Sequence, residues 1–315
     1  MHNTSWDVII IGGGSAGLSA ALQLGRSRRR VLVLDSGAPR NRFAAHMHGV
    51  LGRDGWSPLD LLAAGRDEVG RYGVVVESAD VASASFGADG FEVVVDDGAR
   101  HVARRLLVAT GVRDELPDLP GLTEQWGTGA AVCPYCDGWE VRDRRIAVLA
   151  SGEMSVHQAQ LLRQLSPEVT YFVNGSDLPD EARAGLVARG IAVETREVAR
   201  VLAHDRGALG GIRLVDGSEV PVDAIFLHPR PVPNDAVLRS LGATTAELAG
   251  VDWVAVDAEG RTSVPGLWAA GNVVSPRTSV PIASGSGNAV GAMINAELVE
   301  EDVRLAVAAS GASVA

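Results

Sequence analysis

Short, continuous hydrophobic runs alternate with helical patterns along this chain. Residues 6–11 (WDVIII) and 31–34 (VLVL) read as buried strands, and a helical pattern at residues 18–25 (LSAALQLG) lies between them. The same order returns at residues 145–173, where a strand, a helix and a further strand are expected. Such alternation is typical of parallel sheets covered by helices. The pattern therefore predicts an α/β protein with two strand–helix–strand units.

Two proline-rich stretches divide the chain. Residues 116–121 (LPDLPG) and 229–233 (PRPVP) interrupt the hydrophobic pattern and suggest linkers. We therefore expect one domain made of residues 1–116 and 234–315, split by an inserted domain at residues 117–233. Further strands and hairpins are predicted before the first linker and in the second half of the insertion.

The turn after the first strand has the spacing G-x-G-x-x-G. Gly12, Gly14 and Gly17 allow, in that order, a tight turn, close approach of the backbone to a pyrophosphate, and close packing of the helix on the strand. Asp35 ends the second strand, where an acidic residue accepts hydrogen bonds from an adenosine ribose. Strand, glycines, helix, strand and acid occur in the order that predicts a dinucleotide site, although they do not distinguish FAD from NAD.

The only two cysteines of the chain form the motif Cys133-Pro134-Tyr135-Cys136. This spacing lets one helical turn bring both sulfurs within bonding range. A purely structural disulfide would close a very short loop and stabilise the fold weakly. A zinc site would need further ligands, and the nearest histidine, His157, is isolated in sequence. Redox chemistry is therefore favoured over the structural and metal-binding alternatives.

Composition narrows the class of protein. The 315 residues are 46% hydrophobic and 21% charged, which is typical of a folded protein of about two domains. The net charge of −11 argues against a nucleic-acid partner. We expect no membrane span, because the longest uncharged stretches are rich in Gly, Ser and Asn. We expect no signal peptide, because the first strand begins within a few residues of Met1. A redox-active cysteine pair without structural disulfides favours a cytoplasmic location.

The C-terminal third resembles a known flavoprotein family. Residues 264–272 (VPGLWAAGN) and the following helical segment, residues 281–297, resemble the second FAD-binding segment of flavoprotein disulfide reductases. With the glycine loop, the Ala109-Thr110-Gly111 turn and the C-x-x-C-Asp-Gly motif, the whole chain resembles the low-molecular-weight thioredoxin reductases. The resemblance implies two Rossmann-like dinucleotide-binding domains, each a three-layer ββα arrangement, an FAD cofactor and a homodimer.

The resemblance also assigns roles to individual residues. Cys136 is expected nearest the flavin, Cys133 is expected to exchange with substrate, and Asp137 is expected to act as acid and base. A simple helix-start carboxylate is the alternative for Asp137. The residues expected at the FAD are Gly12, Gly14, Ser15, Ala16, Gly17, Asp35, Ser36, Arg42, Ala109, Thr110, Gly111, Gly271, Asn272 and Ala283. Asn272 stands where the family usually has Asp.

The inserted domain departs from the thioredoxin reductases at its own nucleotide loop. Residues 150–155 (ASGEMS) keep only Gly152 of the glycine pattern, and Glu153 would put a carboxylate where a pyrophosphate binds. Residues 171–175 (YFVNG) offer no arginine pair for a ribose 2′-phosphate. NADPH binding is therefore predicted to be lost or very weak, the alternative being a degenerate loop that still binds nicotinamide.

A branch of the same family with dioxygen as electron acceptor fits this departure. Residues 41–49 (NRFAAHMHG) and 53–55 (RDG) resemble the enzymes that form disulfides in small dithiols of the gliotoxin and holomycin type. His46 and His48 are then candidate general bases, or else surface histidines without a role. Trp126 and Trp139 are candidate pocket walls, or core residues.

These observations predict an FAD-dependent dithiol oxidase with a small-molecule dithiol as substrate, dioxygen as acceptor and hydrogen peroxide as product. The first alternative is a thioredoxin reductase-like enzyme that takes electrons from NADPH or ferredoxin. The second is a non-enzymatic flavin redox sensor.

Overall fold

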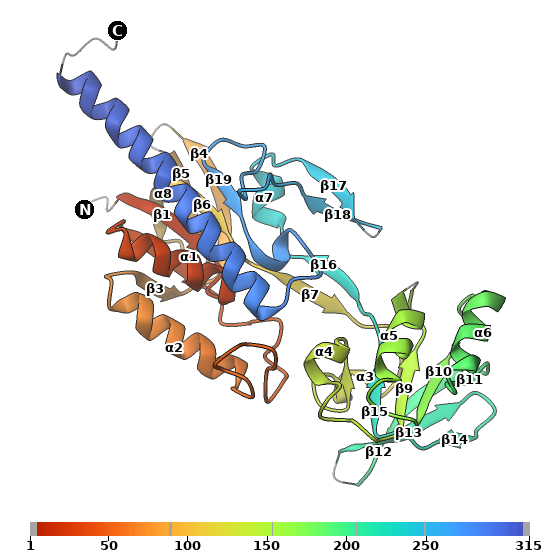
Figure 1. Cartoon of the computed structure of the whole chain (residues 1–315). Helices are drawn as coiled ribbons and strands as arrows, with labels where there is room; N and C mark the ends of the chain where they lie inside the picture. Colours follow the sequence, from red (N-terminus) through yellow and green to blue (C-terminus); the bar gives the residue numbers. More distant parts are fainter. Residues whose placement is uncertain (1–4, 88–89, 153, 206, 249, 311–315) are drawn as a thin grey trace. The chain divides into compact units, whose positions relative to one another are not determined.

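The chain forms two compact units (Figure 1). The computed structural model describes residues 5–87, 90–152, 154–205, 207–248 and 250–310. The first unit comprises residues 1–40, 59–113 and 231–315, and the second comprises residues 41–58 and 114–230. The sequence analysis expected the boundaries at residues 116 and 233, and it did not expect residues 41–58 to group with the inserted unit.

A seven-stranded sheet forms the centre of the first unit. Its order is β3-β2-β1-β6-β5-β4, and β19 pairs in parallel with the end of β6. The strands of this unit are β1 Ser5–Ile11, β2 Val31–Asp35, β3 Val75–Ser78, β4 Val81–Gly87, β5 Gly90–Val95, β6 Arg100–Val108, β17 Thr245–Leu248, β18 Val251–Val254 and β19 Leu267–Ala269. Its helices are α1 Ser15–Arg26, α2 Pro58–Gly70, α7 Ala236–Ser240, the 3₁₀ turn η1 Gly271–Val273, and α8 Val280–Ser310.

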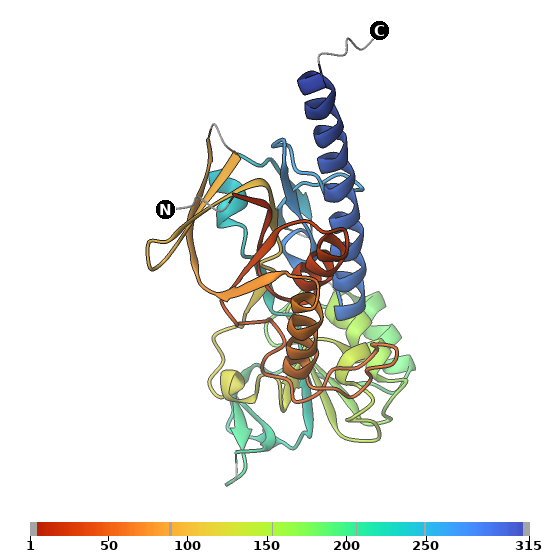
Figure 2. The same cartoon turned by 90° about the vertical axis from the view of Figure 1, so that its left-hand side faces the viewer.

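The apolar runs become the central strands because both faces of the sheet are covered. Helices α1 and α8 lie side by side on one face, as Figure 2 also shows, and pack on a core that includes Val8, Ile10 and Val33. On the other face, α7 and β18 contribute Leu238 and Val254 to a second core. The result is the three-layer arrangement predicted from the sequence.

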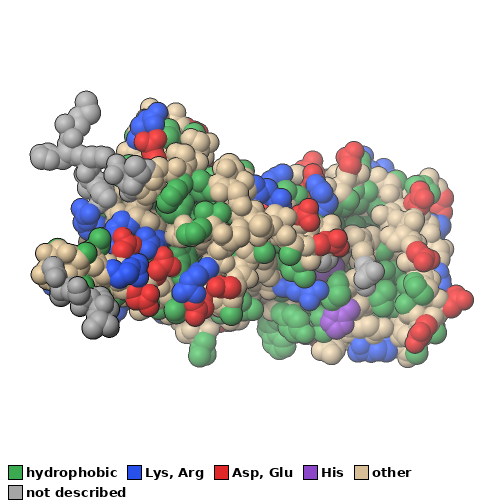
Figure 3. Space-filling model, turned by 90° about the horizontal axis from the view of Figure 1, so that it is seen from above, with side chains coloured by type: hydrophobic (Ala, Val, Ile, Leu, Met, Phe, Trp, Pro, Cys, Tyr) green, Lys and Arg blue, Asp and Glu red, His purple; other side chains and the backbone are tan. Residues whose placement is uncertain are grey.

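Small residues let α1 and α8 approach closely. A Cβ at Gly287 of α8 would collide with the backbone oxygen of Ala16, and one at Gly291 would lie 2.9 Å from that of Ala20. Farther along α8, Arg105 of β6 donates to Glu297 and Glu301 at 2.5 and 2.6 Å. On the face drawn in Figure 3, acidic and basic side chains are interspersed.

The second unit repeats the three-layer plan around a parallel sheet of order β11-β10-β9-β15-β8. Helices α5 and α6 cover one face, and the antiparallel sheet β12-β13-β14 covers the other. Its strands are β8 Ala130–Ala131, β9 Ile146–Leu149, β10 Val169–Phe172, β11 Ala192–Glu194, β12 Val198–Ala203, β13 Leu209–Leu214, β14 Glu219–Val220 and β15 Ala224–Phe226. Its helices are α3 Leu122–Gln125, α4 Pro134–Asp137, α5 Met154–Leu162 and α6 Asp180–Ala188.

Strands β7 Val112–Glu115 and β16 Arg230–Pro233 pair where the chain passes from one unit to the other and back. None of the helices in the described residues combines the length and the apolar character needed to cross a membrane.

Candidate active site

The glycine loop of the first unit has the geometry that its sequence predicts. Gly12 adopts φ +104°, and a Cβ there would lie 2.5 Å from the carbonyl oxygen of Ala109. A Cβ at Gly17 would collide with the carbonyl oxygen of Gly12. A Cβ at Gly14, in contrast, would meet no atom within 4 Å. The first and third glycines thus serve close packing, whereas the second leaves open space in front of α1, which begins at Ser15.

Asp35 closes the loop from the neighbouring strand. Its Oδ1 accepts a hydrogen bond of 3.0 Å from the backbone N–H of Gly13, and its Oδ2 lies 3.4 Å from the guanidinium of Arg66. Parallel pairing of β1 with β2 puts the carboxylate next to the glycines. The acid therefore lies where the fingerprint places a ribose-binding group.

The Ala109-Thr110-Gly111 turn lies beside the glycine loop because β6 is the other parallel neighbour of β1. Thr110 donates from Oγ1 to the carbonyl of Asn234 at 2.6 Å, and Gly111 adopts φ +72°. The side-chain amide of Asn234 donates back to the carbonyl of Thr110 at 3.0 Å. The hydroxyl of Thr110 is therefore engaged within the protein.

The segment after β19 reaches the same end of the sheet. Gly271 adopts φ +78°, and a Cβ there would lie 2.9 Å from Cβ of Ala16. Asn272 directs its amide nitrogen to the carbonyl of Ser275 at 3.0 Å. Ala283 is buried in the first turn of α8. Three segments far apart in sequence thus meet at the carboxyl ends of β1, β6 and β19, the edge where parallel sheets bind ligands.

Two of the predicted cofactor residues lie outside this cluster of contacts. Ser36 is exposed directly after β2. Arg42 belongs to the second unit, where its guanidinium lies 4.2 Å from the ring centroid of Phe43. The sequence could not separate Ser36 and Arg42 from the residues that contact the glycine loop, because both follow the strand that ends in Asp35.

Cys133 and Cys136 form a disulfide at the start of the single-turn helix α4, with their Cα atoms 5.2 Å apart. Cys133 is the N-cap residue, Pro134 takes the first helical position, and the backbone N–H of Cys136 donates to the carbonyl of Cys133 at 3.0 Å. Tyr135, between the cysteines, is 80% exposed. The motif thus forms the turn that its spacing predicts, with both sulfurs in bonding range.

Asp137 follows the disulfide directly and is half-buried. Burial raises the pKa of its carboxyl to about 6, the nearby charge of Glu140 adds to that rise, and His48 opposes it. A carboxyl with this pKa exchanges protons close to neutral pH. The surroundings of Asp137 therefore suit an acid–base group better than a permanently ionised helix-start carboxylate.

His48 lies in the group of charged residues around Asp137. Its Nε2 is 3.4 Å from Oε1 of Glu140, and its Nδ1 is 3.4 Å from Oδ2 of Asp54. Asp54 in turn accepts the backbone N–H of Gly49 at 2.9 Å, which fixes the loop that carries the histidine. The sequence analysis named His48 but missed Glu140 as its partner, because no sequence period links the two positions.

His46 is exposed, and its Nδ1 lies 3.1 Å from the carbonyl oxygen of Gly55. Trp139 is 63% exposed beneath the guanidinium of Arg142, whereas Trp126 packs against the core of the second unit. Of the two histidines proposed from the sequence, His48 is thus the one that contacts a residue of the segment after the disulfide. Trp126 is partly buried against the core of the second unit.

Comparison with known proteins identifies the family. A family model described as pyridine nucleotide-disulphide oxidoreductase matches residues 6–303. The chain belongs to this family. It is an oxidoreductase of the thioredoxin reductase-like type, as expected from the order of its motifs.

Relatives of this oxidoreductase span the same length. Thioredoxin reductase tcpT of Claviceps purpurea is 34% identical over 310 residues, covering 94% of this chain and 95% of the relative. Thioredoxin reductase sirT of Leptosphaeria maculans is 31% identical over 315 residues, covering 95% and 96%. The crystal structure of HlmI is 44% identical, with a TM-score of 0.92 over 99% of this chain and 98% of that one.

Thioredoxin reductase-like members of this family are flavoproteins that use FAD, and FAD is the cofactor of this oxidoreductase. The first unit fits the group. The open space at Gly14 and the first N–H groups of α1 suit a pyrophosphate, and Asp35 suits the adenosine ribose.

The corresponding loop of the second unit differs at the position of the ribose-binding acid. Pairing of β9 with β10 aligns Leu149 with Phe172, as β1 with β2 aligns Ile11 with Leu34. The position that corresponds to Asp35 is therefore Val173, which is buried and has no ribose-binding acid.

Polar groups of this second loop are hydrogen-bonded within the protein. The N–H of Ser151 donates to Oγ of the buried Ser155 at 3.0 Å, and Oγ of Ser151 accepts the N–H of His228 at 2.9 Å. Asn174 accepts the N–H of Val198 at 2.9 Å. Glu153, which the sequence analysis placed at the pyrophosphate position, lies outside the described residues.

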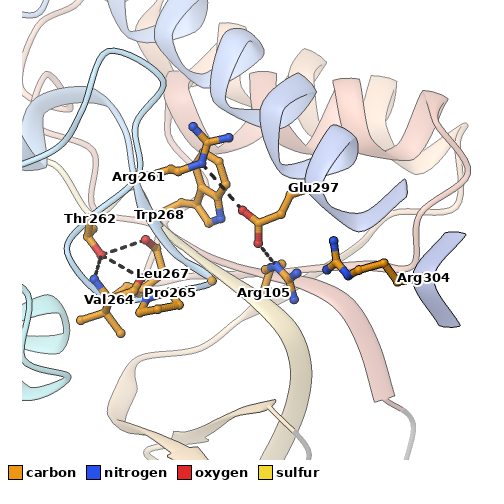
Figure 4. A pocket seen from close by; sticks show the side chains of 10 residues that line it. Arg105, Arg261, Thr262, Val264, Pro265, Leu267, Trp268, Glu297 and Arg304 are labelled. Carbon is orange, nitrogen blue, oxygen red and sulfur yellow. Dashed lines mark hydrogen bonds and ion pairs between the residues drawn. The ribbon is translucent and has the colours of Figure 1, made fainter. Parts of the chain in front are cut away.

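A cavity of about 320 Å³ lies at the amino end of β19 (Figure 4). Its walls include Arg105, Arg261, Trp268 and Glu297. Arg261 lies 4.8 Å from the centre of the Trp268 ring, and Arg105 is paired with Glu297. Because the cofactor residues gather at the opposite, carboxyl end of this strand, the cavity is not part of the FAD site.

Proposed function

We propose that this oxidoreductase is an FAD-dependent dithiol oxidase. A small-molecule dithiol is the substrate, dioxygen is the electron acceptor, and each turnover converts one dithiol and one O₂ into one disulfide and one hydrogen peroxide. The sequence resemblance of residues 41–49 and 53–55 to dithiol oxidases supports this proposal. We further propose a cytoplasmic homodimer, which light scattering on the purified protein tests.

The observation that carries the proposal is the difference between the two nucleotide loops. A Cβ at Gly14 or at its counterpart Gly152 would meet no atom within 4 Å, so the difference lies at the end of the partner strand, which in the first loop is Asp35. In the second loop the buried Val173 stands where the acid would be, and the backbone N–H of Ser151 donates to Ser155 where that of Gly13 donates to Asp35. An enzyme that keeps its flavin-binding site and its disulfide but has lost its nicotinamide-binding site must exchange electrons with another molecule. Dioxygen can serve as that electron acceptor.

The cysteines carry the exchange chemistry. A substrate thiolate attacks Sγ of Cys133, the bond to Cys136 breaks, and a mixed disulfide forms. The second substrate thiol then loses its proton and attacks the substrate sulfur, which releases the product disulfide and leaves both cysteines reduced. FAD, when bound, accepts the two electrons of the reduced pair and transfers them to the acceptor.

The charged residues beside the disulfide handle the protons. We assign His48 as the base that takes a proton from a substrate thiol, since its contact with Glu140 brings it to the segment that follows the disulfide. Asp137, with a pKa of about 6, returns a proton to the cysteine that leaves. His46 remains a second candidate base at the exposed face of the same loop.

Aerobic turnover tests this function directly. The purified flavoprotein is mixed in air with a panel of small dithiols, and oxygen uptake, peroxide and product disulfide are measured. Equal amounts of all three are expected, and NADPH should not be required. Absence of oxygen uptake with every dithiol would count against an oxidase.

The names of the curated relatives favour a second candidate, a thioredoxin reductase-like enzyme supplied by NADPH or another donor. Anaerobic addition of NADPH separates the two. Rapid bleaching of the flavin absorbance supports the reductase, whereas an unchanged spectrum that bleaches on addition of dithiol supports the oxidase.

A further inference from the structure

Gln158 is a buried polar residue that the chemistry above does not use. It lies in the middle of α5, the helix that follows the altered nucleotide loop, and is 1% exposed. Helix α4, which carries the cysteines, packs against α5. Burial of a side-chain amide removes its hydrogen bonds to water, so it costs free energy unless hydrogen bonds within the protein replace them.

One end of this amide holds the backbone just before the disulfide. Nε2 of Gln158 donates to the carbonyl oxygen of Val132 at 2.7 Å. That carbonyl belongs to the peptide group that leads into Cys133, the N-cap residue of α4. The hydrogen bond therefore fixes the strand-to-helix turn from which the exchanging cysteine projects.

The other end of the amide lacks a partner. Oε1 of Gln158 is buried and accepts no hydrogen bond from the described residues. Exchanging the two ends of the amide would not help, since a carbonyl oxygen cannot donate to the carbonyl of Val132. A buried acceptor without a donor disfavours the state in which it occurs.

We propose that Gln158 is a positioning residue that makes the Cys133–Cys136 disulfide a stronger oxidant. Reduction by a substrate dithiol adds two electrons and two protons to the pair and creates S–H donors in the turn that Gln158 holds. In the reduced state an S–H group of this turn donates to Oε1 of Gln158. In the oxidised state Oε1 has no donor in the described part of the chain, so the oxidised state is disfavoured. This inference rests on the redox role proposed for the pair, and it fits an enzyme whose disulfide must take electrons from its substrate.

The test measures the thiol–disulfide equilibrium of the pair in the holoenzyme. Wild type, Gln158→Met and the control Gln164→Met are equilibrated anaerobically in buffers of reduced and oxidised dithiothreitol. The free thiols are then alkylated, and mass spectrometry of the intact protein gives the fraction of reduced pair. Gln164 is an exposed glutamine just beyond the end of α5, so its replacement controls for adding a methionine. Gln158→Met should lower the equilibrium constant for reduction of the pair about tenfold, or about 30 mV, with Gln164→Met unchanged.

A second variant separates the loss of the acceptor oxygen from the loss of the hydrogen bond to Val132. Gln158→Glu loses the hydrogen bond to Val132 as Gln158→Met does but retains an acceptor oxygen, so its pair should be reduced more readily than that of Gln158→Met. An unchanged equilibrium in Gln158→Met, or a pair in Gln158→Glu that is no more readily reduced than that of Gln158→Met, overturns the inference while leaving the oxidase intact. If dithiothreitol reduces the pair in every variant but air produces no peroxide, the proposed function fails and the role of Gln158 does not.

Discussion

Nε2 of His48 lies 3.4 Å from Oε1 of Glu140, and this contact joins two segments that are far apart in the sequence. His48 belongs to residues 41–58, and Glu140 follows the disulfide helix α4. The charges of both act on Asp137, in opposite directions. Since all these residues belong to the same unit, their contact does not depend on how the two units are oriented.

Two substitutions in this cluster should therefore shift the pH dependence of dithiol oxidation in opposite directions. Glu140→Gln removes a like charge and should lower the pKa of Asp137, whereas His48→Asn removes an opposing charge and should raise it. Because Asp137 acts in its protonated form, it should set the alkaline limb, and we expect the midpoint of that limb, near pH 6 in wild type, to move by about half a pH unit either way. Anaerobic single-turnover flavin reduction by dithiothreitol measures it.

Glu124→Gln is the matched control for this experiment, because Glu124 is an exposed carboxylate of the same unit. Its profile should coincide with that of wild type. Movement of both cluster variants in the same direction would show that Asp137 does not set the limb.

Substitutions at Gly17 and Gly14 of the glycine loop should have different effects, on folding and on FAD binding respectively. Gly17→Ala should disrupt the first unit even without cofactor, because the added methyl collides with the carbonyl of Gly12. Gly14→Ala should fold normally as the apoprotein but lose FAD affinity, by a factor of about 100, because its methyl enters the space left for the pyrophosphate. Thermal unfolding of the apoproteins and fluorescence titration with FAD separate the effects. Equal loss of stability in the two apoproteins would contradict this assignment.

Loss of either sulfur should stop turnover at a different stage. Cys133→Ser should abolish product formation, with a fall of at least about 1,000-fold, because no disulfide remains to receive the substrate thiolate. Cys136→Ser should still accept substrate at Cys133, so that a mixed disulfide accumulates when an oxidised substrate is supplied. Mass spectrometry of the intact protein detects that adduct. An adduct on Cys136 in the Cys133→Ser variant alone would reverse the two roles.

Local patterns predicted much of the fold. Continuous apolar runs gave β1, β2, β9 and β10 to within a residue or two at each end, because fully buried strands need nonpolar side chains on both faces. The helix expected at residues 281–297 extends from Val280 to Ser310. Its last third has exposed apolar side chains such as Val303, so the pattern that signals a buried helix face ends before the helix does.

The parts that the sequence could not predict depend on contacts between distant segments. Residues 41–58 pack on the second unit through Phe43, whose Cβ lies 2.5 Å from where a Cβ of Gly127 would be. The partners of His48 and Gln158 follow from the same tertiary packing. The sequence shows that Ser155 replaces a glycine of the pattern. It could not predict that Ser155 accepts a hydrogen bond from the N–H of Ser151, because that contact depends on the backbone conformation of the loop.

The raised pKa of the half-buried Asp137 carboxyl leads to one further prediction, on stability. An unfolded aspartate titrates near pH 3.9, and the folded value of about 6 means that the native state binds more protons between these limits. Stability should therefore fall as pH rises through this window, and the cost should be fully present above pH 7. Asp137→Asn removes the ionisation, so the variant should be more stable than wild type by about 3 kcal/mol at pH 8 and equal to it near pH 3. Denaturant unfolding of the oxidised protein at the two pH values checks this, and the same gain at both would show that charge burial is not its cause.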